Sequence, residues 1–266
     1  MTETGIRKLL NVMASLRDSE HGCPWDLEQT HDSLVPYLIE EAYEVVESIE
    51  SDGGRGLVDE LGDILFQVVF HARIAEEQGR FSFDDVVDAI CDKLIRRHPH
   101  VFAGWRVLSA DQQSRQWEAH KSAERSATGR VSDQGSLLAG VPRALPAMTR
   151  GIKLQQRAAH AGFDWTAVDQ VLAKVDEELA ELREAFDAGE PEDRVEHEIG
   201  DLLQAVTNLA RHVNVDPESA LRKANGRFEK RFAFIEAQAR RTGGTVSSMS
   251  LPEMEALWQQ AKEKGY

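Results

Sequence analysis

Apolar residues recur every three or four positions over most of the chain, which is the spacing of amphipathic helices. In the first half this pattern predicts helices over Gly5–Leu16, Ser33–Glu50, Leu57–Gln78 and Phe83–Ile95. In the second half it predicts helices over Lys153–His160, Val168–Ala188, Arg194–Val213, Glu218–Arg241 and Glu253–Lys264. Alternation typical of strands is nowhere strong enough to compete, so the sequence predicts an all-α protein.

The segment between these two groups of helices has a different composition. Residues 104–148 hold one polar helix candidate, Ala110–Arg125, followed by stretches rich in Ser, Gly and Pro. Such a density of these residues is typical of an interdomain linker. The sequence therefore predicts an N-terminal helical module over 1–103, the linker over 104–148 and a C-terminal helical module over 149–266.

The two predicted modules share one pair of motifs, EExxE and, about twenty residues later, ExGD. The first module has them at Glu40-Glu41-x-x-Glu44 and Glu60-Leu61-Gly62-Asp63. The second has them at Glu177-Glu178-x-x-Glu181 and Glu198-Ile199-Gly200-Asp201. Such a repeat indicates two tandem copies of one helical unit.

The acids of each motif fall on one helix face, because residues three apart are neighbours on a helix. The short break between the two helices predicts an antiparallel hairpin, with both motifs roughly 10 Å from its turn. Four carboxylates should therefore face one another in the second module, from Glu178, Glu181, Glu198 and Asp201. The first module repeats this arrangement with Glu41, Glu44, Glu60 and Asp63.

A solvated helix face explains these acids poorly. Asp63 and Asp201 are embedded in apolar sequence, and Asp is a weak helix former. Acids that converge without basic partners repel one another and lose hydration, whereas a divalent cation relieves both costs. All-oxygen ligation suits Mg²⁺, or Mn²⁺, better than Zn²⁺. A di-iron centre is disfavoured because it requires Glu-x-x-His, and the third residue after Glu60 and Glu198 is Asp.

Composition and charge narrow the possible partners. The chain has 46 acidic and 31 basic residues and a formal charge of −15, which disfavours general nucleic-acid binding. An anionic substrate would need a metal ion or a local group of cations. Cys23 and Cys91 match no zinc or redox spacing. The sequence has no signal-peptide pattern and no apolar run of membrane-spanning length, so we expect a cytoplasmic protein without a membrane partner.

The ordered motifs resemble the MazG family of nucleoside triphosphate pyrophosphohydrolases, which has the all-α NTP pyrophosphatase fold. The resemblance covers nearly the whole chain and rests on GCPWDLEQTH, PYLIEEAYEVVESI, DELGDILFQVVFHA, RRHPHVF, GFDW, KVDEELAEL, EIGDLLQAVTNLAR and RFEKRF. It implies Mg²⁺-dependent hydrolysis of a nucleoside triphosphate (NTP) to the monophosphate and pyrophosphate by a homodimer. It also assigns metal binding to the four acids of the second module.

The resemblance further assigns nucleotide contacts in the second module. They fall on Lys174, Glu177, Arg194, His197, Lys223, Asn225, Arg227 and Trp258. One departure from the family pattern is visible in KANGRFEKRF, where Gly226 replaces an acid and Arg227 a lysine. The charge is retained, but Arg and Lys bind phosphate with different geometry. Glu177, beside the proposed ligand Glu178, is the candidate to orient or deprotonate the attacking water.

The basic residues rank the two modules. Aligning the two modules on their shared motifs places Lys174, Arg194 and Lys223 of the second module opposite Tyr37, Gly56 and Ala89 of the first. Of the four cations, only Arg227 has a basic counterpart, Lys93. A triphosphate needs cations beside the metal. The second module is therefore predicted to be the main catalytic one. The first is predicted to be a weaker or differently specific site, or a structural and dimerising copy.

Three functions remain open from the residues. The leading hypothesis is an NTP pyrophosphohydrolase, and a second is a house-cleaning hydrolase for one damaged or deoxy nucleotide. The third is a non-enzymatic nucleotide sensor or protein-binding scaffold in which the metal sites are structural.

Trp165 is expected to be a packed aromatic, whereas Trp25 is compatible either with packing in the core or with stacking on a base. The motifs leave the base, the sugar and the attacked phosphorus open.

Overall fold

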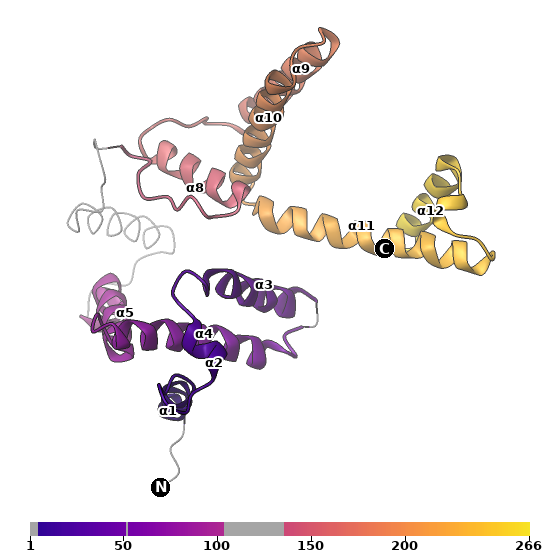
Figure 1. Ribbon diagram of the computed structural model, residues 1–266. Helices are drawn as coiled ribbons and strands as arrows, with labels where there is room; N and C mark the ends of the chain where they lie inside the picture. Colours follow the sequence, from indigo (N-terminus) through magenta and orange to yellow (C-terminus); the bar gives the residue numbers. More distant parts are fainter. Residues whose placement is uncertain (1–4, 52, 104–135) are drawn as a thin grey trace. The chain divides into compact units, whose positions relative to one another are not determined.

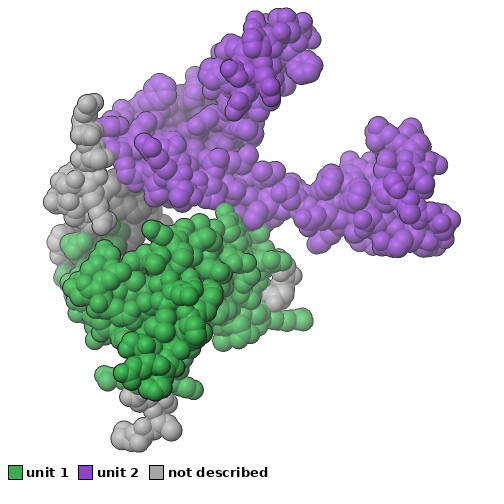
Figure 2. All heavy atoms as spheres, viewed as in Figure 1, with its two compact units in different colours: residues 1–121 green, residues 122–266 purple. Residues whose placement is uncertain are grey.

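The computed structural model describes residues 5–51, 53–103 and 136–266, with Ser51 described by its backbone alone. These residues form α-helices, one short 3-10 helix and connecting loops, without a strand among them, which confirms the all-α prediction (Figure 1). The predicted helix Ala110–Arg125 lies outside the described residues. The chain divides into two compact units, Met1–Lys121 and Ser122–Tyr266 (Figure 2). In the described part of the chain, no helix is both long and apolar enough to cross a bilayer.

Unit 1 is built around its fourth helix. Its helices are α1 (Ile6–Leu16), α2 (Pro24–Glu28), α3 (Val35–Ser51), α4 (Leu57–Glu77), α5 (Phe83–Arg97) and α6 (Pro99–Phe102). The buried core joins Phe70 and Ile74 of α4 to Met13 of α1 and to Leu34, just before α3. The sequence pattern missed α2 and α6, because each is too short for apolar periodicity. Both begin at a proline, which favours the first helical position.

Unit 2 contains the second set of helices. They are α8 (Ala147–His160), α9 (Val168–Asp187), α10 (Glu192–His212), α11 (Pro217–Arg241), the 3-10 helix η1 (Val246–Ser248) and α12 (Leu251–Glu263). Most begin within two residues of the predicted start, but α8 begins at Ala147, inside the stretch predicted as linker. The start of α11 is fixed by Asp216, whose Oδ1 accepts a hydrogen bond from the Ser219 N–H at 2.7 Å.

Each unit contains a helical hairpin that carries the two acidic motifs. The hairpin is α3–α4 in unit 1 and α9–α10 in unit 2, and each is held by extensive contacts between its two helices. In unit 2, α8 packs against α10. The approach is closest at the buried Gly151, where an added Cβ would lie 3.3 Å from Thr207 Cγ2. The predicted hairpins are therefore present, and α8 closes one side of the second.

Candidate active site

Three acids of the second module come together between α9 and α10. Carboxylate oxygens of Glu178, Glu198 and Asp201 all lie within 4.8 Å of one another. Glu178 and Glu198 are buried and Asp201 is half-buried. Glu181 is half-buried one turn further along α9 and is not part of this set. The hairpin thus brings acids from both motifs to one level, and we call Glu178, Glu198 and Asp201 the unit 2 acid cluster.

Two cations of the same hairpin pair with this cluster. Lys174 Nζ lies 2.7 Å from Glu178 Oε1 and 2.7 Å from Glu177 Oε1, while Arg194 Nη2 lies 2.5 Å from Glu198 Oε1. Hydrogen bonds to Glu177 and then Glu178 raise the pKa of the Lys174 ammonium group above its usual value. The expectation that the converging acids lack basic partners is therefore wrong for this module, because each cation lies one helical turn before its acid.

Glu198 keeps one carboxylate oxygen without a partner. The residue is 1% exposed, and its Oε2 atom is buried with no hydrogen-bond partner among the described residues. Leaving a buried acceptor unsatisfied costs about 1–3 kcal/mol, and more for a charged group. An added cation would remove that cost. The donors of the cluster are all carboxylate oxygens, and this set fits a hard divalent cation such as Mg²⁺ or Mn²⁺.

Glu177 and His197 lie next to the cluster without belonging to it. Glu177 is exposed and accepts the hydrogen bond from Lys174. His197 Nε2 lies 3.4 Å from Asp201 Oδ2, and its Nδ1 lies 3.1 Å from Arg194 Nη1. Arg194, His197 and Asp201 therefore form a polar row along α10 that leads to the rim of the cluster.

Four residues assigned by the resemblance do not reach the acid cluster within one chain. Lys223, Asn225 and Arg227 are exposed on α11, which runs through Gly226 without a break. On α12, the ring centroid of Trp258 lies 5.1 Å from that of Phe228, and the Arg231 guanidinium lies 5.4 Å from the same Trp258 centroid. Trp258 is thus engaged in packing within its own chain.

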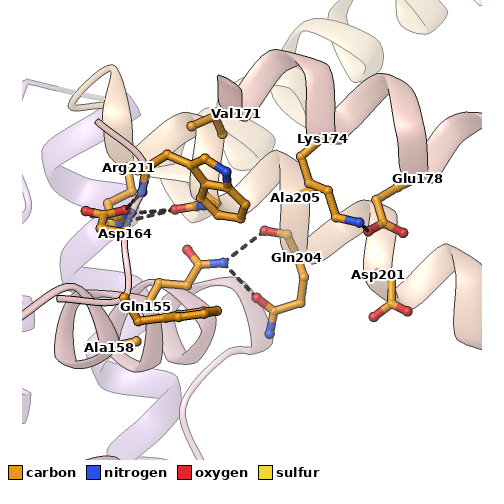
Figure 3. Close-up of a pocket in the computed structure, with 13 residues that line it drawn as sticks. Gln155, Ala158, Asp164, Val171, Lys174, Glu178, Asp201, Gln204, Ala205 and Arg211 are labelled. Atoms are coloured by element: carbon orange, nitrogen blue, oxygen red, sulfur yellow. Dashed lines mark hydrogen bonds and ion pairs between the residues drawn. The ribbon is translucent and has the colours of Figure 1, made fainter. Parts of the chain in front are cut away.

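A pocket of about 230 Å³ lies beside the unit 2 acid cluster. Its lining comes from α8, α9, α10 and the loop between α8 and α9. Figure 3 shows Lys174, Glu178 and Asp201 together on one side of it, and the Asp164–Arg211 pair on the other. The pocket is therefore continuous with the groups that would hold a metal and phosphate.

Sequence reasoning missed a pair of glutamines in this pocket. Gln155 of α8 donates from Nε2 to the backbone oxygen of Gln204 at 2.9 Å and to its Oε1 at 2.7 Å. A single glutamine on a helix has no spacing pattern that marks it, so this contact between distant helices appears only in the structure. Trp165, expected as a packed aromatic, lines the pocket and is 38% exposed.

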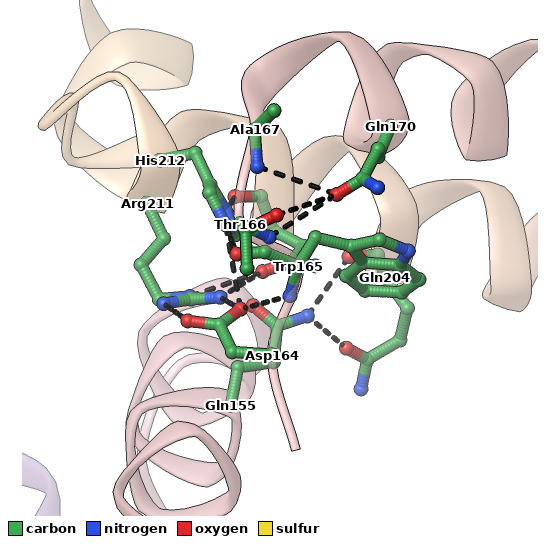
Figure 4. Close-up of polar contacts among 10 residues, drawn as sticks. Gln155, Asp164, Trp165, Thr166, Ala167, Gln170, Gln204, Arg211 and His212 are labelled. Carbon is green, nitrogen blue, oxygen red and sulfur yellow. Dashed lines mark hydrogen bonds and ion pairs between the residues drawn. The ribbon is translucent and has the colours of Figure 1, made fainter. Parts of the chain in front are cut away.

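The loop that carries Trp165 is held firmly onto α10 (Figure 4). Arg211 Nη1 donates to Asp164 Oδ2 at 2.9 Å, and its Nη2 contacts Asp164 Oδ1. Hydrogen bonding from Arg211 holds the pKa of the Asp164 carboxyl below its usual value. His212 Nε2 lies 3.3 Å from the Trp165 backbone oxygen. Gly162, with φ of +90°, makes the left-handed turn that ends α8 and starts the loop.

Unit 1 has a second acid cluster, which is more exposed. Carboxylate oxygens of Glu41, Glu60 and Asp63 lie within 4.8 Å of one another. Burial, followed by the charge of Asp63, raises the pKa of Glu41, while burial and the charge of Glu44 raise that of Glu60. Among the described residues no Lys or Arg pairs with these three acids. Their mutual repulsion is therefore uncompensated.

Comparison with known proteins links this geometry to a family. Residues 29–102 match the MazG nucleotide pyrophosphohydrolase domain, and residues 145–228 match the phosphoribosyl-ATP pyrophosphohydrolase family. The chain is 46% identical to the nucleoside triphosphate pyrophosphohydrolase of Escherichia coli strain K12 over 260 residues, 97% of both chains. It is 42% identical to the nucleoside triphosphate pyrophosphohydrolase/pyrophosphatase MazG of Thermotoga maritima over 264 residues, 98% of both chains. With relatives of this identity aligned over 97–98% of both chains, the chain belongs to the MazG family of nucleoside triphosphate pyrophosphohydrolases.

Proposed function

We propose that this protein hydrolyses NTPs to the nucleoside monophosphate and pyrophosphate, using Mg²⁺ or Mn²⁺ held by the unit 2 acid cluster with Glu181 close by. The observation that carries the metal assignment is the buried, unpartnered Oε2 of Glu198 beside two further carboxylates. Membership of the MazG family supports the reaction. A divalent cation bound there supplies positive charge to phosphate oxygens and lowers the pKa of a bound water.

The residues around the cluster have separate roles in this proposal. A water oxygen forms a bond to the α phosphorus while the bond from that phosphorus to the oxygen bridging the α and β phosphates breaks, and pyrophosphate leaves with the electron pair of the broken bond. Glu177 accepts the proton of the water or orients it, since it neighbours Glu178 and is exposed. Its hydrogen bond to Lys174 keeps its carboxylate beside the cluster.

Lys174 and Arg194 change partners in the proposed reaction. Both are paired with cluster carboxylates, at 2.7 Å and 2.5 Å. A divalent cation held by those carboxylates would serve as their counterion in place of the two side chains. Lys174 and Arg194 are then available to neutralise the triphosphate and the departing pyrophosphate. His197, which contacts Arg194, orients its guanidinium.

A second copy of the chain supplies the remaining nucleotide contacts in this proposal. The assigned residues of α11 and α12 do not line the pocket of their own chain. Large apolar side chains are exposed on the helices of unit 2, at Leu172, Phe186, Ile199, Leu203, Leu221 and Phe228. Exposed apolar side chains of this size are available for a protein–protein contact, and the nucleotide contacts left incomplete in one chain need a partner, so we propose a homodimer. Light scattering should give twice the 29.7 kDa chain mass, and Phe228→Glu should lower it.

The first module has a subordinate role in this proposal. Its acid cluster has no paired Lys or Arg among the described residues, and Tyr37 and Gly56 occupy the positions of Lys174 and Arg194. We therefore propose that it binds a divalent cation mainly for structure and contributes little to NTP turnover.

A substrate panel separates this function from its two rivals. The protein is incubated with the ribo- and deoxynucleoside triphosphates and with damaged analogues, and the rate of pyrophosphate release is measured for each. Comparable turnover of several ordinary NTPs supports the general hydrolase. Turnover of one deoxy or damaged nucleotide alone supports the house-cleaning enzyme. Nucleotide binding without any turnover supports the scaffold.

A further inference from the structure

The pocket beside the unit 2 acid cluster extends well beyond the groups that phosphate chemistry uses. Lys174, Glu178 and Asp201 line one end, whereas the remainder is lined by aromatic, amide and small apolar side chains and by the paired Asp164 and Arg211 (Figure 3). Its volume of about 230 Å³ is below the about 300–1,000 Å³ of sites that enclose whole drug-sized ligands. The pocket therefore suits one part of a nucleotide, with the phosphates left at the charged end.

The contacts of the glutamine pair determine which of its amide atoms donate hydrogen bonds and which accept them. The backbone oxygen of Gln204 can only accept, so the Gln155 atom that contacts it at 2.9 Å is the amide nitrogen. Gln155 Nε2 also contacts Gln204 Oε1, which fixes the second amide. Gln155 Oε1 is left buried with no partner among the described residues. A ligand with an N–H or O–H group would satisfy it.

An aromatic wall lies beside this buried acceptor. Trp165 and Phe163 both line the pocket, and they are 38% and 80% exposed. Asp164 lies between them in the sequence, and its pairing with Arg211 holds their loop to α10 (Figure 4). An exposed indole face next to a hydrogen-bond acceptor, on a loop held through its backbone and Asp164, is suited to a planar, polar heterocycle, which stacks on the ring and donates at its edge.

The first module has apolar side chains at two positions where this pocket has polar ones. Gln204 and Asn208 lie six and ten residues after the first residue of the shared ExGD motif, and the same positions in the first module are Phe66 and Phe70. The Phe66 and Phe70 rings pack 5.6 Å apart, and Phe70 is fully buried in a core with Met13. The two modules therefore share an acid cluster but differ in the space beside it.

We propose that this pocket of unit 2 binds the nucleoside part of the NTP, with the base stacked on Trp165 and donating a hydrogen bond to Gln155 Oε1. This assignment rests on the proposed function, because it takes the acid cluster as the site of the triphosphate. It names Gln155, Gln204 and Trp165 as the residues that make the site prefer a nucleotide over a bare triphosphate.

Equilibrium binding with Mg²⁺ tests the proposal without turnover. Calorimetry compares an NTP analogue with a non-hydrolysable α,β-bridge against inorganic tripolyphosphate, which has no nucleoside. Wild type should bind the analogue more tightly. Gln204→Phe, which places the first-module side chain in the pocket, should raise the Kd of the analogue by at least about tenfold. It should leave tripolyphosphate binding unchanged. The matched control is Gln156→Phe on the exposed face of α8, which should change neither ligand.

A second variant keeps the test decisive if Gln204→Phe does not fold. Gln155→Leu keeps the pocket volume but removes the acceptor. It should raise the Kd of the analogue by about tenfold and leave that of tripolyphosphate unchanged. The proposal is overturned if wild type binds both ligands equally, or if a folded variant weakens both by the same factor. Absence of binding of either ligand to wild type overturns the proposed function itself. Tight analogue binding without hydrolysis overturns the proposed reaction and leaves the pocket assignment standing.

Discussion

Arg194 lies one turn before Glu198 on α10, and its Nη2 atom is 2.5 Å from Glu198 Oε1. The arginine side chain is half-exposed, whereas the glutamate is buried and its other oxygen has no partner among the described residues. The guanidinium therefore pairs with only one of the two carboxylate oxygens of Glu198. A metal bound through Oε2 would draw on the same negative charge, so arginine and metal compete for one carboxylate.

Arg194→Ala should make this competition measurable. In EDTA the variant should be less stable than wild type by about 1–3 kcal/mol, because the buried Glu198 carboxylate loses its partner. Mg²⁺ should bind the variant more tightly than wild type in the absence of nucleotide, while the KM for NTP should rise. Thermal melts and calorimetric Mg²⁺ titrations measure both effects. Lys153→Ala, an exposed cation on α8, is the control, and weaker Mg²⁺ binding by Arg194→Ala would contradict the competition.

The two acid clusters should contribute unequally to turnover. Glu178→Ala or Asp201→Ala should lower NTP hydrolysis more than about 100-fold, beyond the about 10–100-fold typical of residues that only support metal ligands. Glu41→Ala or Asp63→Ala should retain a substantial part of the activity, because their cluster lacks paired cations. Steady-state rates with matched melting temperatures give the comparison. Equal losses in both modules, with fold and dimer intact, would show that the ranking is wrong.

Mg²⁺ should stabilise the folded protein through the acid clusters. A ligand that binds only the folded state adds about 2.7 kcal/mol at a hundredfold excess over its Kd. Asp201→Asn keeps the side-chain shape but weakens one cluster, so its Mg²⁺-induced rise in melting temperature should be smaller than that of wild type. In EDTA the variant should melt no lower than wild type.

The remaining shift in Asp201→Asn has a defined source. Unit 1 keeps Glu41, Glu60 and Asp63, so Mg²⁺ should still stabilise the variant to some extent. Combining Asp201→Asn with Asp63→Asn should remove most of that remainder. An undiminished Mg²⁺ shift in the double variant would mean that neither aspartate is a ligand.

The unit 1 acid cluster should make the metal-free protein sensitive to pH. Burial and the charge of Glu44 raise the pKa of Glu60 above 4.5. A carboxyl with a raised folded-state pKa holds its proton more tightly when folded, so stability falls as the pH rises from about 4.5 through the raised value. Glu60→Gln removes this loss. Its melting temperature relative to wild type in EDTA should therefore increase between about pH 4.5 and about pH 7.

Comparing Glu60→Gln with wild type also removes the pH dependence that other acids contribute to stability. Asp164 and Glu77 have lowered pKa values because of Arg211 and Arg17, and they favour stability at higher pH. They are unchanged in Glu60→Gln, so they cancel in the difference between the two proteins. Saturating Mg²⁺ at neutral pH should also reduce the difference, and a difference independent of pH would contradict the role of Glu60.

The helices and the hairpins were accessible from sequence because long apolar periodicity determines them. Glu178 and Asp201 could be assigned to one site because EExxE and ExGD fix both the helix face and the distance from the turn. The pairing of Lys174 with Glu178 follows the same i, i+4 rule, yet the prediction treated the acids as lacking basic partners. Lys174 and Arg194 had been assigned to the triphosphate, and their pairing with the acids in its absence was not considered.

The nucleoside pocket could not be derived in the same way. The contact between Gln155 and Gln204 depends on how closely α8 approaches α10, and no periodic pattern encodes that distance. Gly151 permits the approach, but its role is visible only once Thr207 is seen opposite it. The start of α8 at Ala147 was missed for a related reason, because the preceding prolines are typical of a linker.

A time course of NTP hydrolysis followed by phosphorus NMR tests the central claim most directly. Wild type with Mg²⁺ should give the nucleoside monophosphate and pyrophosphate in equal amounts from the first time points. EDTA should stop the reaction. Glu198→Gln, which neutralises the buried carboxylate while keeping its shape, should give almost no product although the protein remains folded. Orthophosphate as the initial product, or a Glu198→Gln rate equal to that of wild type, would contradict a metal-dependent pyrophosphohydrolase centred on the unit 2 acid cluster.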